Sequence, residues 1–233
     1  MFVIKIADIK IAIKNKFDFI VRQCEEYLIE SNDVDFSVEV SNEEFLAEKN
    51  ASGEKFSDGF IESVCIYRNI AKQLPYYNAF VLHCAAVEKD GVAYCFAARS
   101  GVGKTTHVTL WKKVFEDVEI INGDKPIVRF FNGKPFVCGT PWGGKENFHS
   151  NKIVPIRSIC FLNRGSNIIS RLTTEKVLPK ILLQAFIPKE KVTADLTINM
   201  IGNLLKSVSF WSLECDISDS AAKLSYETMS NGE

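Results

Sequence analysis

Apolar and polar positions follow one another along this chain in a pattern that changes at about residue 78. The first part alternates between strand-like and helical spacing, and it predicts a strand or hairpin, a helix, a strand and a second helix at residues 2–13, 17–29, 35–40 and 57–74. Ser57 and Asp58 are favourable N-cap residues, and the helix that they begin ends before Pro75. Residues 1–78 are therefore predicted to form a small α/β region, and they contain no recognisable chemical motif.

The second part, residues 79–233, has longer apolar runs. Strands are predicted at residues 81–87, 92–97, 118–122, 126–131, 135–138, 156–162 and 210–215, and helices at residues 104–115, 174–186, 193–207 and 218–229. Two hairpin signals, Lys89-Asp90-Gly91 and Asn132-Gly133, lie between strands and require antiparallel pairs. The expected fold class is α/β, with a mixed, partly antiparallel sheet instead of a doubly wound parallel one.

Composition adds limits to this picture. The chain has 233 residues, of which 46% are hydrophobic and 11% aromatic, and this is enough for a packed core. The formal net charge of -1 gives no reason to expect nucleic acid or a membrane surface as a partner. Seven cysteines without metal-site spacing are expected to be buried, reduced thiols. Because neither a signal-peptide pattern nor a run of about 18 uncharged apolar residues is present, we expect a soluble, cytoplasmic protein.

One segment carries a strong chemical signal, a loop that follows a predicted strand and precedes a predicted helix. It consists of Ala98, Arg99, Ser100, Gly101, Val102, Gly103, Lys104 and Thr105, and Thr106 follows it. The pattern matches the phosphate-binding P-loop, except that Ala98 stands where glycine is usual. That position mainly needs a small residue, so the sequence predicts that a nucleoside triphosphate binds here.

The residue types of this loop explain the chemistry. Backbone N–H groups at a helix N-terminus attract phosphate, and glycines let the backbone approach without a Cβ clash. Lys104 would supply a positive charge to the β- and γ-phosphates, and the Thr105 hydroxyl would be a magnesium ligand. The expected cofactors are ATP, or another nucleoside triphosphate, and Mg²⁺.

Two further side chains are candidates for the same site. Asp124 follows the predicted strand at residues 118–122, where a carboxylate can reach a metal ion or an attacking hydroxyl. His83 lies in the apolar run before the P-loop strand, and its setting alone is more typical of a core residue. His107 and His149 are expected on the surface or on a helix face.

A glycine-rich loop at residues 139–146 follows the second hairpin. Besides glycines it contains Thr140, Lys145 and Glu146, which are candidate residues on the substrate side of the site. Such a loop can cover phosphates or an acceptor, or it can be a wide turn between strands. The sequence leaves both interpretations open.

With these residues in place, the sequence resembles the HPr kinase/phosphorylase-like P-loop kinases, above all their short bacterial branch, whose fold is shared with phosphoenolpyruvate carboxykinase. The matching pieces are the P-loop and four other segments, residues 82–87, 121–126, 139–146 and 213–215. The resemblance implies that Asp124 is the catalytic base and that His83 belongs to the site. It covers roughly residues 79–229 and, more loosely, the N-terminal third.

The sequence departs from the family pattern in three places. Lys125 stands where the kinases have a second acid, and only Glu146 is a candidate for their magnesium-binding glutamate. The C-terminal region that recognises HPr has no counterpart, so HPr is not the expected acceptor. The sequence predicts an ATP- and magnesium-dependent kinase that acts on a hydroxyl of a peptide, protein or small molecule.

Two other functions remain open at this point. A nucleotide-binding sensor or scaffold without turnover is the main alternative, because Lys125 replaces the second acid. Carboxykinase-like chemistry ranks last, since it would need an arginine-rich carboxylate pocket and the arginines are scattered along the chain. A homo-oligomer is compatible with the sequence.

Overall fold

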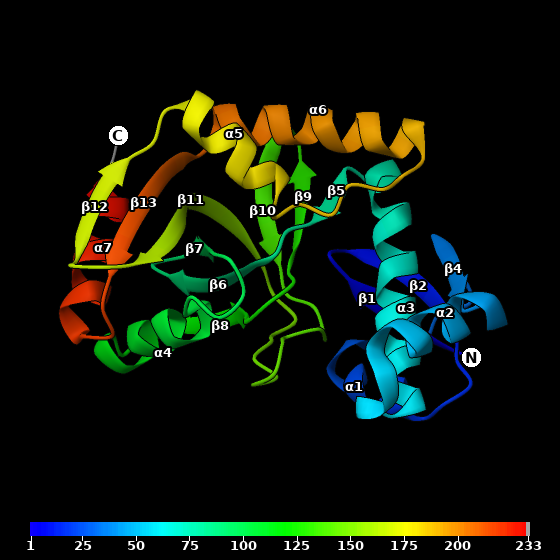
Figure 1. Ribbon diagram of the computed structural model, residues 1–233. Coiled ribbons are helices and arrows are strands. Elements are labelled where there is room, and N and C mark those ends of the chain that lie inside the picture. Colours follow the sequence, from blue (N-terminus) through cyan, green and yellow to red (C-terminus); the bar gives the residue numbers. More distant parts are fainter. Residues whose placement is uncertain (232–233) are drawn as a thin grey trace.

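The computed structural model describes residues 1–231 and contains two β-sheets with helices packed on them (Figure 1). A four-stranded sheet is formed by the N-terminal part of the chain, and a nine-stranded sheet contains the later strands. Parallel and antiparallel neighbours both occur in the large sheet. The prediction of an α/β protein with a mixed sheet and a small N-terminal α/β region is confirmed.

The small sheet has the strand order β3-β1-β2-β4. Its strands are β1 (Phe2–Ile6), β2 (Ile9–Lys14), β3 (Leu28–Ile29) and β4 (Phe36–Glu39). β1 and β2 form the hairpin that the alternation at residues 2–13 predicts, and β4 runs parallel to β2. Ile4 and Ile11 are fully buried, because alternate residues of both strands face the helices.

Three helices complete this region: α1 (Phe19–Gln23), α2 (Asn42–Ser52) and α3 (Asp58–Gln73). α3 begins where the sequence predicts, since the Ser57 hydroxyl accepts the backbone N–H of Phe60 at 3.3 Å. α1 is shorter than predicted, because the chain turns into β3 at Leu28. α2 was not predicted and buries no residue, but Ser41 and Glu44 form a capping box that marks its start in the sequence.

The large sheet contains nine strands. They are β5 (Ala79–Val81), β6 (Cys84–Lys89), β7 (Val92–Ala97), β8 (Glu119–Asn122), β9 (Ile127–Phe131), β10 (Lys134–Cys138), β11 (Ile153–Arg164), β12 (Ile168–Arg171) and β13 (Ser209–Cys215). The order along the main path is β5-β9-β10-β11-β7-β6-β8, and β13 pairs with β11 and β12. β11 runs parallel to β7 and to β13, whereas β6–β7 and β9–β10 are antiparallel.

Both predicted hairpins are present in the large sheet. Asp90 and Gly91 connect β6 to β7 with φ of 56° and 76°, and Asn132 and Gly133 connect β9 to β10 with φ of 49° and 78°. Two successive positive φ values are typical of the type I′ turn, whose twist matches that of the flanking strands. The first hairpin places β6 beside the strand that leads into the glycine-rich motif.

The apolar run at residues 81–87 is not one strand, as predicted, but parts of β5 and β6. β5 pairs with β9, whereas β6 pairs with β7 and β8. Between them the backbone N–H of His83 donates to the carbonyl of Gln184, 2.8 Å away. Local alternation cannot reveal this break, because the partner comes from a segment far along the chain. His83 therefore lies at a bend between two strands.

Four helices cover the two faces of the large sheet (Figure 1). α4 (Lys104–Val114) and α7 (Asp219–Asn231) pack on one face, and α5 (Thr174–Leu182) and α6 (Lys191–Ser207) pack on the other. A further hydrophobic core contains both Ile4 of the small sheet and Ile127 of the large one. The predicted boundary at residue 78 thus separates two sheets that share a core.

The sequence predicts buried, reduced cysteines and no membrane-spanning segment. The seven cysteines are free thiols, and all except the half-buried Cys215 are buried. Within residues 1–231, no helix is long and apolar enough to cross a membrane.

Candidate functional site

The segment at residues 98–105 leads from β7 into α4, whose first residues are Lys104 and Thr105, in the strand–loop–helix order that the sequence predicts. Gly101 and Gly103 have φ of 80° and 125°, values at which other residues are strained. α4 has no side-chain cap and no acidic residue in its first turn. Its first backbone N–H groups and its helix dipole are therefore available to an anion.

Lys104 is nearly buried although it carries a basic group, with 8% of its surface exposed. Its Nζ lies 2.9 Å from Nε2 of His83. Burial lowers the pKa of Lys104, and the carboxylate of Asp124 partly counteracts this effect by favouring the charged form. Burial leaves little water around this ammonium group. Its attraction to a bound phosphate would therefore be only weakly screened.

Asp124 follows β8 and contacts two basic side chains. Its Oδ1 is 3.1 Å from Nε2 of His83, and its Oδ2 is 3.7 Å from Nζ of Lys125. Burial acts to raise the pKa of Asp124, but the hydrogen bond with His83 and the positive charges of Lys125 and Lys104 outweigh it. The pKa lies below its ordinary value of 3.8, so the carboxylate is ionised and can accept a proton at neutral pH.

His83 links the other two groups through one ring nitrogen. Its Nε2 faces both Lys104 Nζ and Asp124 Oδ1, and it can serve only one of them at a time. Without a proton Nε2 accepts a hydrogen bond from Lys104, and with a proton it donates one to Asp124. A proton that reaches Asp124 can therefore be shared with the imidazole.

Asn122 is a positioning residue that sequence reasoning missed. It is fully buried at the end of β8, and its Oδ1 accepts the backbone N–H groups of Asp124 and Lys125 at 2.9 and 2.8 Å. Its Nδ2 donates to the carbonyl of Thr140 at 2.9 Å. An Asn side chain that bonds the backbone two residues later is an Asx-turn, so the spacing of Asn122 and Asp124 was the available signal.

The side chains of His83, Lys104 and Asp124 line one cavity of about 330 Å³. Its walls come from the β5–β6 bend, the glycine-rich loop with the start of α4, the turn after β8 and the 139–146 loop. The lining residues are His83, Ser100, Gly101, Gly103, Lys104, Thr105, Thr106, Gly123, Asp124, Gly144, Lys145 and Glu146. Most of the predicted site residues meet in this cavity, which we call the phosphate cavity. Ala98, Arg99 and Val102 line another cavity, beside β11 and α5, and Val102 also lines the cavity between α4 and the turn after β13.

The N-terminal region holds the 139–146 loop in place. The ring of Trp142 stacks on that of Tyr67 from α3, with centroids 4.0 Å apart and planes 10° apart. Trp142 Nε1 also donates to the hydroxyl of Ser63 at 3.0 Å. The hydroxyl of Tyr67 donates to the carbonyl of Lys125 at 2.6 Å. One α3 side chain therefore supports both the loop and the turn that carries Asp124.

The three candidate substrate-side residues of this loop differ in their positions. Thr140 is fully buried, and its hydroxyl donates to the carbonyl of Lys125 at 3.0 Å, so it supports the turn after β8 and does not line the phosphate cavity. Lys145 and Glu146 are exposed and line the cavity. Only these two lie where they could touch a bound molecule.

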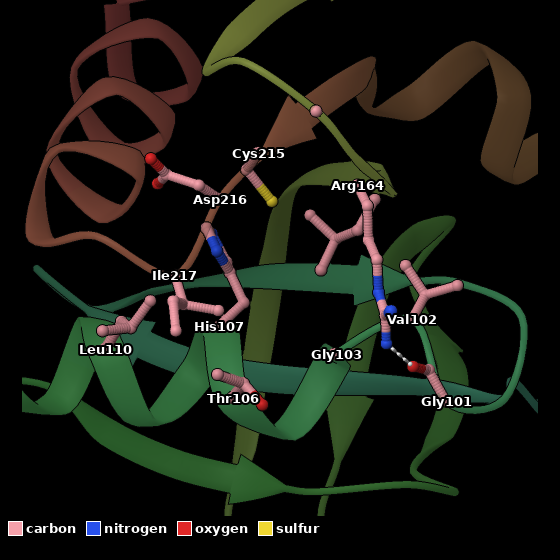
Figure 2. A pocket seen from close by; sticks show the side chains of 12 residues that line it. Gly101, Val102, Gly103, Thr106, His107, Leu110, Arg164, Cys215, Asp216 and Ile217 are labelled. Atoms are coloured by element: carbon pink, nitrogen blue, oxygen red, sulfur yellow. Dashed lines mark hydrogen bonds between the residues drawn. The ribbon is translucent and has the colours of Figure 1, made fainter.

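A second, larger cavity of about 490 Å³ adjoins the phosphate cavity (Figure 2). It lies between α4 and the turn that follows β13, and Gly101, Gly103 and Thr106 line both cavities. Figure 2 shows Arg164 reaching across it to the carbonyl of Gly101, which its Nη2 contacts at 2.8 Å. The two cavities are therefore neighbours along the glycine-rich loop.

His107 of α4 lines this second cavity, and Figure 2 shows its ring rising from the helix toward Asp216. It lies on a helix face, one of the two expected places, but that face is buried, and 2% of the residue is exposed. Burial lowers the pKa of His107 to about 4, so the ring is neutral at pH 7. Nε2 contacts Trp111 and Ser225 at 3.2 Å, whereas Nδ1 has no hydrogen-bond partner among residues 1–231.

The residues of the phosphate cavity fit a magnesium ion that arrives with a nucleotide. In the part of the chain that the structure describes, no group of three or more His, Cys, Asp or Glu side chains could hold a metal ion alone. The Thr105 hydroxyl and the Asp124 carboxylate are oxygen ligands of the type that Mg²⁺ prefers. Mg²⁺ at such sites uses one or two protein ligands and takes the others from phosphates and water.

Comparisons with known proteins do not assign this chain to a family. No protein-family model matches the sequence, and no curated protein matches it. Among solved structures, the chain is similar to the Hpr(Ser) kinase/phosphatase from Coxiella burnetii, with 8% sequence identity and a TM-score of 0.32. The match covers 53% of this chain and 95% of the other. A similarity this low assigns neither an activity nor a substrate.

Proposed function

We propose that this protein is an ATP- and magnesium-dependent kinase that transfers the γ-phosphoryl group to a hydroxyl. The observation that carries the proposal is the phosphate cavity. It brings Lys104 and Thr105, from the glycine-rich loop, together with Asp124 and His83, from segments on either side of that loop. A basic group beside a helix N-terminus suits a triphosphate, and an ionised carboxylate within the same cavity suits a general base.

Each side chain has a defined task in this proposal. The backbone of the glycine-rich loop and Lys104 bind the β- and γ-phosphates, and the Thr105 hydroxyl and Asp124 carboxylate would hold Mg²⁺. When bound, the ion would neutralise charge on the phosphates. Asp124 accepts the proton of the attacking hydroxyl as the new O–P bond forms, and His83 can share that proton.

The nucleoside end of the substrate would lie in the cavity beside α4. This cavity adjoins the phosphate cavity at Gly101, and Leu110 and Ile217 give it apolar walls. The Asp216 carboxylate adds a polar group to these walls. An apolar slot with a few polar atoms is the usual environment of a bound nucleoside.

The test is phosphoryl transfer from radiolabelled ATP to serine-containing peptides and small hydroxyl compounds, with Asp124→Asn against wild type. Loss of a general base lowers kcat by about 10² to 10⁴-fold. Asp195→Asn, an exposed acid on α6, is the matched control. If Asp124→Asn transfers phosphate at the wild-type rate, the role given to Asp124 is wrong.

A nucleotide-binding sensor without turnover is the second candidate, and Lys125 is the observation that favours it. Its Nζ lies 3.7 Å from Asp124 Oδ2. The HPr kinases have a second acid at this position, and such an acid would support a second metal ion, whereas Lys125 would not. Calorimetric ATP binding together with no transfer to any acceptor would support this function over the first. ATP-dependent transfer that requires Asp124 would exclude it.

A further inference from the structure

A third cavity, of about 320 Å³, lies where the N-terminal region meets the large sheet. Its walls come from α3, the end of β5, the β5–β6 bend, the turn after β8 and the segment that follows α5. The lining residues are Val64, Tyr67, Arg68, Ala71, Val81, His83, Lys125, Gln184, Ala185 and Phe186. No residue of the glycine-rich loop is among them, so the proposed kinase function gives this cavity no ligand.

The cavity is pre-formed, because its two main walls are held by backbone structure. In the segment that follows α5, the N–H of Phe186 donates to the carbonyl of Val81 at 2.9 Å. Ala185 of the same segment forms a β-bridge with Leu82. The other main wall is one face of α3, since its residues have the spacing i, i+3, i+4 and i+7: Val64, Tyr67, Arg68 and Ala71. Little order therefore has to be created when a ligand enters.

The inner surface of the cavity is apolar. Ala71 and Val81 are buried, and Val64, Ala185 and Phe186 are half-buried. An apolar group that covers these side chains gains free energy, because it leaves water and removes their remaining surface from water. A sugar, a polyol or a bare phosphate would gain nothing here and would lose hydration. The fitting ligand therefore has an apolar body.

Positive charge gathers at the outer side of the same cavity. Arg68 and Lys125 are its two exposed residues, with side chains that are 42% and 50% exposed. The other lining residues are buried or half-buried, and none of them is acidic. The apolar body of a ligand is thus enclosed, while a charged end reaches the two basic groups. That end has to be negative, because an ammonium group would be repelled.

Both basic groups can bind an anion, although each has an acidic neighbour. Nη2 of Arg68 donates to Glu48 Oε2 at 2.7 Å, and a guanidinium group has further N–H donors. Nζ of Lys125 is 3.7 Å from Asp124 Oδ2, which is beyond hydrogen-bond distance. Neither carboxylate lines the cavity, so a ligand in it meets the cations and not the acids. Because the two acids reduce the local positive charge, a monoanion is favoured over a dianion.

We propose that the third cavity binds a small monocarboxylic acid with an apolar body, such as a medium-chain fatty acid. The hydrocarbon chain lies between α3 and the segment that follows α5, and the carboxylate contacts Arg68 and Lys125. The planar fork of a guanidinium group matches a carboxylate. The site shares only His83 with the phosphate cavity, so binding needs neither nucleotide nor magnesium. This inference goes beyond the proposed kinase function and does not depend on it.

The first experiment is calorimetric titration of the protein with octanoate, butyrate, octanol and octylamine, without nucleotide. Octanoate should bind at least about tenfold more tightly than butyrate, because more methylene groups are buried. It should also bind at least about tenfold more tightly than octanol, which lacks the charge, and octylamine should not bind. No binding of octanoate overturns the proposal, and so does an equal affinity for octanoate and either octanol or octylamine.

The second experiment tests the contact between the carboxylate and Arg68. Arg68→Gln should weaken octanoate binding about tenfold and leave the weaker octanol binding unchanged. Glu48→Gln is the matched control, because it breaks the same ion pair and keeps the charge of Arg68. Octanoate should bind this control at least as tightly as wild type. An equal loss in both variants would assign the effect to the broken ion pair and overturn the proposed carboxylate contact.

The third experiment locates the ligand. Ala185→Trp fills the cavity and should abolish octanoate binding with ATP affinity unchanged, whereas Lys189→Trp, an exposed position in the same segment, should bind octanoate as wild type does. Competition between octanoate and ATP would place octanoate in the nucleotide space and overturn the proposal. Octanoate binding without phosphoryl transfer to any acceptor supports this site and rejects the kinase. Phosphoryl transfer by a protein that does not bind octanoate rejects this site alone.

Discussion

Two loops form opposite walls of the phosphate cavity, and they are held in different ways. The loop at residues 98–105 leads directly from β7 into α4, and its internal bonds join near neighbours, such as Val102 N–H to Arg99 O at 3.3 Å. Arg164 adds one distant contact, to the carbonyl of Gly101. The loop at residues 139–146 has no regular element at its end, because it continues into further irregular chain. Its contacts come from residues that are distant in the sequence.

The second loop depends on the N-terminal region for its shape. Trp142 packs on Tyr67 and donates to Ser63, both on α3. The carbonyl of Pro141 accepts a hydrogen bond from Nε2 of Gln23 at 2.9 Å. Residues 1–78 carry no chemical motif of their own, but they fix a wall of the phosphate cavity.

This difference between the two loops predicts that nucleotide binding and phosphoryl transfer can be lost separately. A local loop keeps its geometry as long as its strand and helix are folded, so nucleotide binding should tolerate damage elsewhere. A loop that is held by distant contacts should lose its position when one of them is removed. The proposed transfer needs both walls and should therefore be the more sensitive of the two functions.

The largest expected effect follows from a substitution in the loop at residues 98–105. Lys104→Met removes the buried positive charge beside the phosphates, and it should lower transfer by about 10³-fold and weaken ATP binding as well. Radiolabelled transfer and calorimetric ATP titration are the measurements. Lys112→Met, an exposed position on the same helix, should leave both unchanged. Transfer near the wild-type level in Lys104→Met would show that the loop does not hold the phosphates.

A smaller effect is expected for the second loop. Trp142→Ala removes the stack on Tyr67, and it should lower the free energy of unfolding by about 3 kcal/mol. Misplacement of the loop by about 1 Å should lower transfer by about 10²-fold while ATP affinity stays near the wild-type value. Phe56→Ala, which removes an exposed stacked ring of the N-terminal region, is the control. If phosphoryl transfer and ATP binding were lost together, the predicted independence of the two loops would be wrong.

The smallest expected effect is the pH dependence of stability that His107, on α4, produces. The pKa of His107 is about 4 in the folded protein and 6.5 when unfolded, so acid protonates the unfolded chain first. Stability is therefore full above pH 6.5 and declines as the pH falls toward 4, by about 2 kcal/mol between pH 7 and pH 5. Urea unfolding of wild type and His107→Gln at both pH values measures this. An equal decline in the variant would assign the loss to other groups.

Local patterns in the sequence accounted for much of the fold. Asp90-Gly91 and Asn132-Gly133 formed the predicted hairpins, because glycine and short polar residues tolerate the positive φ that these turns need. α3 began at its predicted cap, since a cap bond spans only three residues. The break between β5 and β6 was missed, because its cause is a bond from His83 to a segment beyond α5.

The candidate site likewise has one part that the sequence predicts and one part that only the fold reveals. The sequence by itself determined the glycine-rich loop with Lys104 and Thr105, because spacing, glycines and flanking elements are all local properties. Only the tertiary structure placed His83 beside Asp124 and the Trp142 ring on Tyr67. Those contacts join residues from distant parts of the chain, and their distances depend on how both sheets and α3 pack around one core.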